Sequence, residues 1–157
     1  MVALVILVLI IIFAFYFFSN RNKAVVTRRN KIVIDPFLLE KNVLFFSKLN
    51  ADEKIQFEDD VQYFLSHTNI TGVDTAVEEL DRLLVASAAV VPVFYFDGWK
   101  YYNLKEVLLY SDAINLDFES TGNADRNILG MVGTGSLEGK LLLSKHALRL
   151  GFSNKSD

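Results

Sequence analysis

The stretch NILGMVGTGSLEGKLLLSKHALRLGFSNKSD, Asn127–Asp157, decides how the chain is organised. Its glycines, from Gly130 to Gly139, mark a turn, because glycine adopts the positive φ values that tight hairpin turns require. The turn leads into a short apolar strand, Lys140–Ser144, and a polar tail follows at Ser153–Asp157. This pattern predicts a hairpin at the end of the chain.

Two nucleotide-binding motifs do not fit this turn. The P-loop motif GxxxxGK[ST], placed on Gly139 and Lys140, would need a glycine where Thr134 stands and a hydroxyl residue where Leu141 stands. The dinucleotide fingerprint GxGxxG fails as well, since the glycines at 133, 135 and 139 are spaced GxGxxxG. The glycines therefore indicate a turn and not a phosphate site.

Upstream of the hairpin the apolar pattern predicts helices. Pro36–Phe46 suits a short helix with proline at its first position, and Asn50–His67 suits a longer amphipathic one. A third helix is expected over residues 74–91, and its nearly all-round apolar character is typical of a buried central helix. Residues 69–73, between the last two helices, are expected to form only a turn or a brief strand.

The second half of the chain changes to short strand-like segments. Leu104–Tyr110 is mainly apolar, Ile114–Glu119 alternates between apolar and polar residues, and residues 131–132 and 141–143 add two short apolar runs. Two or three helices thus precede several short strands, which is the order of an α+β fold. We expect a small, mostly antiparallel sheet.

The N-terminal segment Val2–Phe18 is an unbroken apolar run. Seventeen helical residues span about 26 Å, close to the roughly 30 Å of a bilayer core. A cleaved signal peptide, the alternative, would have basic residues before the run and a small-residue cleavage site after it, and neither is present. The sequence predicts a transmembrane anchor at 1–18, a basic linker at 19–35 and an α+β domain at 36–157.

Basic residues follow the apolar run and none precedes it. By the positive-inside rule this asymmetry predicts an extracytoplasmic N-terminus and a domain on the cytoplasmic side of a single-pass membrane protein. The rest of the chain is acidic, since the whole has 16 Lys and Arg against 19 Asp and Glu, which argues against nucleic acid as a partner. The flanking basic residues are Arg21, Lys23, Arg28, Arg29 and Lys31.

The residue types that carry out catalysis form no recognisable constellation. The absence of cysteine excludes disulfides, thiolate metal sites and a cysteine nucleophile. His67 and His146 lie far apart, and neither has a second metal ligand at helical spacing. No GxSxG elbow occurs, and the carboxylate pairs are typical of solvated helix faces.

The order of segments from Leu49 to Phe152 resembles the N-terminal half of the Mlc titration factor A family of zinc-dependent peptidases. The resemblance covers about two-thirds of the chain, and it depends on the order and spacing of its segments together. These are the helix FEDDVQYFL, the apolar helix LLVASAAVVPVF, the strand VLLY with SDAI after it, the turn GTGSLEGKLLLS, and KHALRLGF.

In that family a helix with the motif HExxH binds zinc and activates the water that hydrolyses the peptide bond. The resemblance implies that this helix would begin shortly after Asp157, so we expect the chain to be truncated before it. No catalytic or zinc-binding residue and no cofactor are then expected in these 157 residues. The resemblance also implies that the strand Leu141, Leu142, Leu143 and Ser144 lies beside the substrate cleft of a partial zincin-like domain.

Two functions remain open at this point. The first is the membrane-anchored N-terminal part of a zinc-dependent metallopeptidase acting on a peptide or protein substrate. The second is a non-catalytic, membrane-tethered interaction module that binds a regulatory protein, because the resemblance implies binding to a transcriptional repressor in some members.

Overall fold

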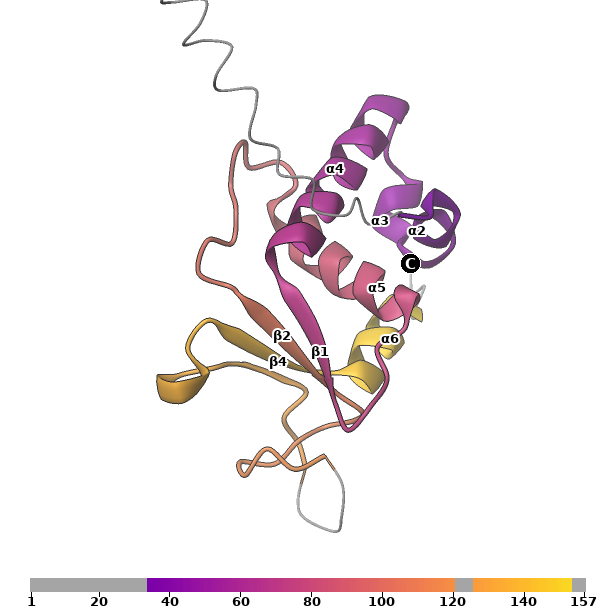
Figure 1. Ribbon diagram of the computed structural model, residues 1–157. Helices are drawn as coiled ribbons and strands as arrows, with labels where there is room; N and C mark the ends of the chain where they lie inside the picture. The colour runs from indigo at the N-terminus through magenta and orange to yellow at the C-terminus, as the bar shows by residue number, and fades with distance from the viewer. Residues whose placement is uncertain (1–33, 121–125, 154–157) are drawn as a thin grey trace, which may run out of the picture. The chain divides into compact units, whose positions relative to one another are not determined.

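A computed structural model describes residues 34–120 and 126–153, which form a layer of helices on a four-stranded sheet (Figure 1). Its α+β composition confirms the predicted mixture of helices and short strands. The elements in chain order are α2 (Pro36–Asn42), α3 (Leu44–Ser47), α4 (Ala51–His67), β1 (Asn69–Val73), α5 (Glu79–Val90), η1 (Val91–Val93), β2 (Glu106–Tyr110), β3 (Gly130–Val132), η2 (Gly135–Leu137), β4 (Lys140–Ser144) and α6 (Lys145–Ser153).

The predicted helix Asn50–His67 is confirmed as α4. The Asn50 side chain accepts a hydrogen bond from the backbone N–H of Glu53 at 3.0 Å, and the Glu53 carboxylate accepts one from the Asn50 N–H at 2.9 Å. This reciprocal capping box satisfies two of the donors that a helix start leaves unpaired. The predicted helix 36–46, by contrast, is divided into α2 and α3, because Val43 takes an extended conformation between them.

Helix α5 is the buried central helix that its composition predicts. Seven of its twelve residues are buried. It begins at Glu79, later than the predicted start, because Asp74 has a positive φ of 53° and so cannot belong to a right-handed helix. Pro92 closes it in the 3₁₀ turn η1. The buried residues are Asp81, Leu83, Leu84, Val85, Ala86, Ser87 and Val90.

The prediction of a mostly antiparallel sheet is wrong. The strand order is β1-β2-β4-β3; β1 pairs with β2, and β2 with β4, in parallel, and only β3 is antiparallel to its neighbour β4. For β1 and β2 the cause is the connection through α5. A helix between two strands returns the chain to the same end of the sheet, and the second strand then runs parallel to the first. Asn69–Val73, expected to be a turn or a brief strand, is the first strand of this β–α–β unit.

The hairpin predicted from the glycine-rich stretch is confirmed. β3 and β4 are antiparallel, with Met131 opposite Leu142, and Gly135 and Gly139 in the connecting turn have φ values of 58° and 77°. Positive φ is readily accessible only to glycine. The turn also contains the short 3₁₀ helix η2.

The strand predicted at Ile114–Glu119 is wrong. Ile114 makes one isolated bridge to Ile128, and the chain then closes into a tight loop. The Asn115 side-chain oxygen accepts hydrogen bonds from the backbone N–H groups of Asp117 and Glu119, both at 2.9 Å, and Phe118 has a φ of 62°. An asparagine side chain that binds the backbone in this way competes with strand pairing.

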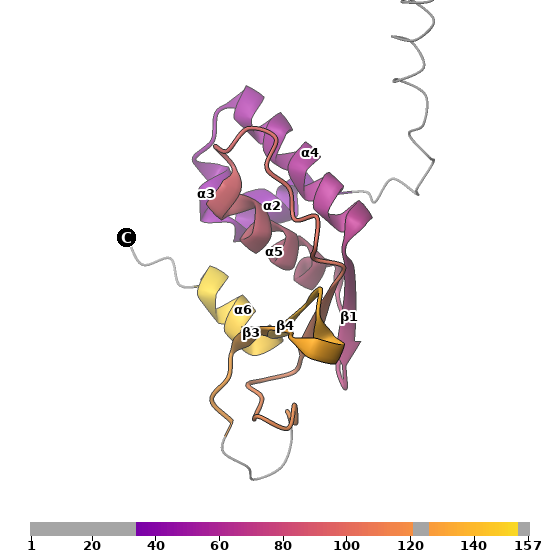
Figure 2. The same cartoon turned by 90° about the vertical axis from the view of Figure 1, so that its left-hand side faces the viewer.

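The two faces of the sheet are covered differently (Figures 1 and 2). The helices lie on one face, where Val107 and Leu109 of β2 are fully buried in the larger apolar core. On the other face, Ile114 from the described residues after β2 joins Tyr110 and Leu142 in a smaller core. Successive side chains along β2 and β4 point to opposite faces of the sheet, so they are divided between the larger and the smaller core.

Helix α6 was not predicted from the sequence, which indicated only the end of a strand and a polar tail in this region. Leu148 and Phe152, four residues apart, pack against the larger core. Their spacing puts both on one face of a helix. In Figure 2, α6 lies on the same side of the sheet as α5.

The predictions of a transmembrane helix and of a single-pass membrane protein require correction. Across residues 34–120 and 126–153, no helix combines the length and the apolar character needed to cross a membrane. The longest, α4, carries charged residues along its length. The predicted anchor at 1–18 and the five basic residues that flank it lie outside the described residues.

A substitution at Gly133 tests how closely the turn of the β3–β4 hairpin packs on itself. A Cβ added at Gly133 would overlap the carbonyl oxygen and the Cβ of Leu137, so Gly133→Ala is expected to lower the free energy of unfolding by about 2 kcal/mol. Gly151→Ala is the matched control. A Cβ at that helical position meets nothing within 4 Å, so it should raise the free energy of unfolding by about 0.5–1 kcal/mol. Urea unfolding measures both, and equal effects of the two variants would contradict the packing described.

Candidate functional site

The predicted cleft strand, Leu141–Ser144, is an internal strand of the sheet. β4 pairs with β2 on one side and with β3 on the other, so its backbone is not open to a peptide. Leu142 and Ser144 are buried, and the Ser144 hydroxyl accepts a hydrogen bond from the Ala147 N–H at 3.1 Å, at the start of α6. That these four residues lie beside a substrate cleft stays a prediction.

The sheet has two edge strands, β1 and β3, and β3 is the one that adjoins the predicted cleft strand β4. The Ser144 N–H donates to the Leu129 carbonyl at 2.8 Å, and the Gly133 N–H donates to the Lys140 carbonyl at 2.9 Å. Because hydrogen-bonding direction alternates along an antiparallel strand, the backbone groups of Gly130 and Val132 point away from β4. No described residue forms a hydrogen bond with them. β3 therefore offers two donors and two acceptors along its outer edge.

An aromatic cavity lies at the C-terminal end of β3. Its volume is about 500 Å³, and it is bounded by the segment 99–104, by Val132 and Gly133, and by residues 138–141. Trp99 and Tyr102 line it and are 46% and 70% exposed, and Val132 is 71% exposed. Trp99 stands edge-on to Tyr101, with ring centroids 4.4 Å apart. The cavity is thus apolar, accessible and adjacent to the free strand edge.

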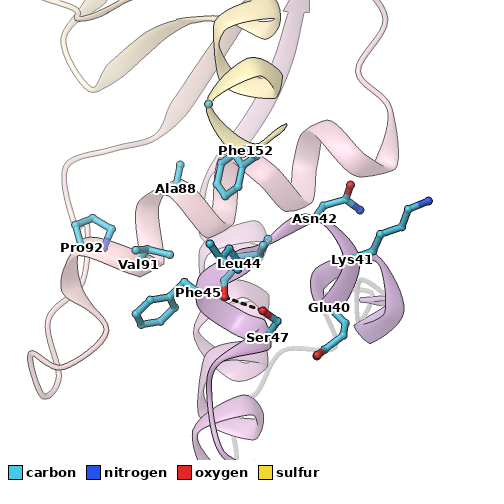
Figure 3. Close-up of a pocket in the computed structure, with 12 residues that line it drawn as sticks. Glu40, Lys41, Asn42, Leu44, Phe45, Ser47, Ala88, Val91, Pro92 and Phe152 are labelled. Carbon is cyan, nitrogen blue, oxygen red and sulfur yellow. Dashed lines mark hydrogen bonds between the residues drawn. The ribbon is translucent and has the colours of Figure 1, made fainter. Parts of the chain in front are cut away.

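A second cavity, of about 350 Å³, lies between the α2–α3 corner, the end of α5 and Phe152 of α6 (Figure 3). Two of its polar side chains, Ser47 and Asn42, are bonded to nearby backbone, and the Glu40 carboxylate pairs with Lys54 at 2.8 Å. The Ser47 hydroxyl donates to the Leu44 carbonyl and the Asn42 amide to the Leu38 carbonyl, both at 2.8 Å. This cavity brings together no group suited to catalysis or metal binding.

Four charged side chains join the start of α5 to α6. Asp81 is completely buried, and it receives the Arg149 Nε at 2.7 Å and the Lys145 Nζ at 3.0 Å. Glu78 contacts the same two cations, each at 3.0 Å. The Glu78 N–H also donates to Asp81 at 2.9 Å, which caps α5. We call these residues the α5–α6 charge cluster: Glu78, Asp81, Lys145 and Arg149.

The cluster keeps its carboxylates ionised. Burial acts to raise the pKa of Asp81, but the hydrogen bonds from Arg149, the Glu78 N–H and Lys145 outweigh it, so the pKa lies below its ordinary value. Hydrogen bonds from Lys145 and Arg149 likewise lower the pKa of Glu78. The pKa values of Lys145 and Arg149 are raised, in each case chiefly by the hydrogen bond to Asp81. The sequence contained a signal for this cluster, since Lys145 and Arg149 are four residues apart on one helix face.

The two histidines are not brought together with other metal ligands. The His67 ring stacks on Tyr63 with centroids 4.0 Å apart, and its Nδ1 lies 2.8 Å from the Tyr63 carbonyl oxygen. His146 is exposed at the start of α6. Within the two described ranges, no three His, Asp or Glu side chains are grouped so that they could hold a metal ion. The described residues therefore do not fit a zinc ion.

Comparison with known proteins assigns the chain to a family. The family model described as glucose-regulated metallo-peptidase M90 matches residues 19–157. The chain belongs to this family. The match confirms the resemblance to metallopeptidases of the Mlc titration factor A type, and it includes both the open β3 edge and the α5–α6 charge cluster. No curated protein and no solved structure matches the M90 chain.

The buried Asp81 makes the stability of this M90 chain depend on pH. Because its folded-state pKa is lowered, its contribution is present above the unfolded pKa, near 4, and is lost as the pH falls through the folded value. The urea midpoint is therefore expected to fall between pH 5 and pH 3. Asp81→Asn, which cannot ionise, should be less stable than the wild type at pH 6 and should lose less stability on acidification.

The size of the effect follows from breaking a buried ion pair. Asp81→Ala is expected to cost about 3–5 kcal/mol at pH 6, because it leaves two cations without their buried partner. Asp52→Ala, in the first turn of α4 and exposed, serves as the control, with an expected change below about 1 kcal/mol. A pH dependence that is identical in wild type and Asp81→Asn would contradict this assignment.

Proposed function

We propose that this chain is the substrate-binding, N-terminal part of a zinc-dependent metallopeptidase that hydrolyses peptide bonds. The observation that carries the proposal is the metallo-peptidase family match over residues 19–157. Two structural features support it: the free outer edge of β3, and the direct passage from β4 into α6 at Ser144.

The part of this chain in the reaction is to hold the substrate. The outward N–H and C=O groups of Gly130 and Val132 are suited to an extended peptide, which would continue the sheet beyond β3. An extended peptide fixed in this way exposes its scissile bond in one orientation, which reduces the entropic cost of reaction. Zinc, when bound in the complete protein, would supply a water activated for attack on the amide carbonyl.

We propose that the zinc ligands of this enzyme lie in residues after Asp157. Among the described residues, neither His67 nor His146 belongs to a group of three His, Asp or Glu side chains that could hold a metal ion, and the buried carboxylate of Asp81 already binds Lys145 and Arg149. A residue engaged in a neutralised cluster is a poor metal ligand, because zinc would have to displace two cations from it. The proposal therefore requires an HExxH helix in the residues that follow.

A second candidate is a protein-interaction module without catalysis. It is favoured by the run of exposed aromatic side chains that follows α5, since exposed aromatic residues are enriched at protein interfaces. Its partner would be a regulatory protein in place of a substrate. The residues concerned are Tyr95, Phe96, Trp99 and Tyr102.

Reading the encoding DNA past codon 157 separates the two candidates. The enzyme proposal expects the frame to continue into an HExxH motif within a few tens of residues. The 157-residue chain itself, equilibrated with zinc and passed through gel filtration, is expected to retain less than one zinc per chain when measured by mass spectrometry. A His67→Ala, His146→Ala double variant is the control for weak surface binding.

Either of two results would overturn the proposal. A stop after codon 157 with no such motif beyond it would leave the interaction module as the better account. One zinc per chain that is lost in the double histidine variant would place a metal site within this chain, against the location proposed here.

A further inference from the structure

The cavity beside β3 is in register with the free strand edge. Val132 faces the helix side of the sheet together with its partner Leu141, and both residues line the cavity. Residues directly opposite one another in paired strands place their side chains on the same face. The residue of a bound peptide that lies opposite Val132 would therefore direct its side chain toward the cavity.

The walls of the cavity are held together by backbone contacts. The Lys105 N–H donates to the Gly139 carbonyl at 2.8 Å, which ties the segment 99–104 to the hairpin. Gly139 has a φ of 77°, and a Cβ at this position would lie 3.0 Å from the Asn103 carbonyl oxygen. Only glycine permits so close an approach in this conformation. The cavity is thus a preformed feature of the fold.

The chemistry of the walls favours an apolar occupant. Trp99 and Tyr102 present large, partly exposed aromatic surfaces, which gain from covering by another apolar group. The two lysines in the walls are already neutralised, Lys100 by Asp60 at 2.6 Å and Lys140 by Glu106 at 2.9 Å. Because neither cation is free and Glu138 also lines the cavity, an acidic or phosphorylated side chain is disfavoured.

We propose that this cavity is a specificity pocket that receives a large apolar side chain, aromatic or leucine-like, from an extended peptide whose backbone pairs with β3. Its volume of about 500 Å³ is within the range of small-ligand sites, roughly 300–1,000 Å³. The inference rests on the proposed function in one respect, since it takes the peptide to be the substrate. Backbone pairing supplies affinity that is independent of sequence, and the pocket supplies the choice of residue.

Trp99 is the only tryptophan of the chain, so its fluorescence reports directly on the pocket. The full chain is titrated, in the presence of a chelator, with a capped heptapeptide of small polar residues and a central phenylalanine. The fluorescence of Trp99 is expected to change and to saturate. The same peptide with a central serine is expected to bind at least about fivefold more weakly, as is the phenylalanine peptide with N-methyl groups on alternate residues.

Variants with a matched control locate the binding site. Tyr102→Ala should weaken binding of the phenylalanine peptide by about fivefold. Phe96→Ala removes an equally exposed aromatic ring that does not line the cavity, so it should leave the dissociation constant unchanged. Both side chains are mainly exposed, and circular dichroism checks that the variants remain folded. If either variant fails to fold, the N-methylated peptide tests the proposal on the wild-type chain.

Several results would overturn the proposal. They are the absence of a saturable change, equal affinity for the phenylalanine and serine peptides, equal affinity for the N-methylated peptide, and equal weakening by the two variants. Self-association seen by analytical ultracentrifugation and abolished by Tyr102→Ala would assign the surface to a second copy of the chain instead. Because no step requires zinc, these outcomes are independent of the search for an HExxH motif, which tests the proposed function alone.

Discussion

The burial of α5 is the constraint on which the rest of the structure depends. This helix joins β1 to β2, so it sets the parallel direction of these two strands. Its leucine and valine side chains form much of the larger core, together with Phe57 and Val61 of α4 and Val107 of β2. A helix apolar on nearly every side is stable in water only when other elements cover it. The remaining helices and the sheet provide that cover.

One charged residue breaks this apolar surface, and it determines where α6 lies. Asp81 is completely buried, and an isolated carboxylate would be strongly disfavoured there. Lys145 and Arg149 neutralise it, and both belong to α6. Since α6 follows β4 without a connecting loop, the same ion pairs also help to position β4, an internal strand of the sheet. Ion pairs and apolar contacts thus both hold α6 against α5.

The features that could be predicted from the sequence are local ones. The capping box at Asn50, the buried character of α5 and the glycine-dependent hairpin each depend on residues that are close together in the chain. The direction of β1 could not be read in this way, because Asn69–Val73 has little strand character alone and pairs with residues about 37 positions away. The strand predicted at Ile114–Glu119 failed for a local reason. Its residues alternate as in a strand, but the Asn115 side chain bonds to the backbone and closes a loop.

In the candidate site, too, local features could be predicted from the sequence, and features that depend on distant residues could not. The residues of the predicted cleft strand do form a strand, but its internal position is a property of the sheet order and not of its own sequence. The pocket beside β3 combines the segment 99–104 with residues about 30 positions further along, and its aromatic residues alone did not indicate a cavity. The family resemblance was the stronger guide to function, because it used the order of many segments at once.

The shortness of β3 has a consequence for solubility. An open strand edge is a template on which further chains can add, and long, flat edges are sites of aggregation. β3 has only three residues, and the chain leaves the sheet direction at the turn that begins with Gly133. Two outward-facing residues are too few to support the stacking of strands into a fibril, which requires segments of about six residues. The edge can therefore remain available in solution without promoting the growth of an intermolecular sheet.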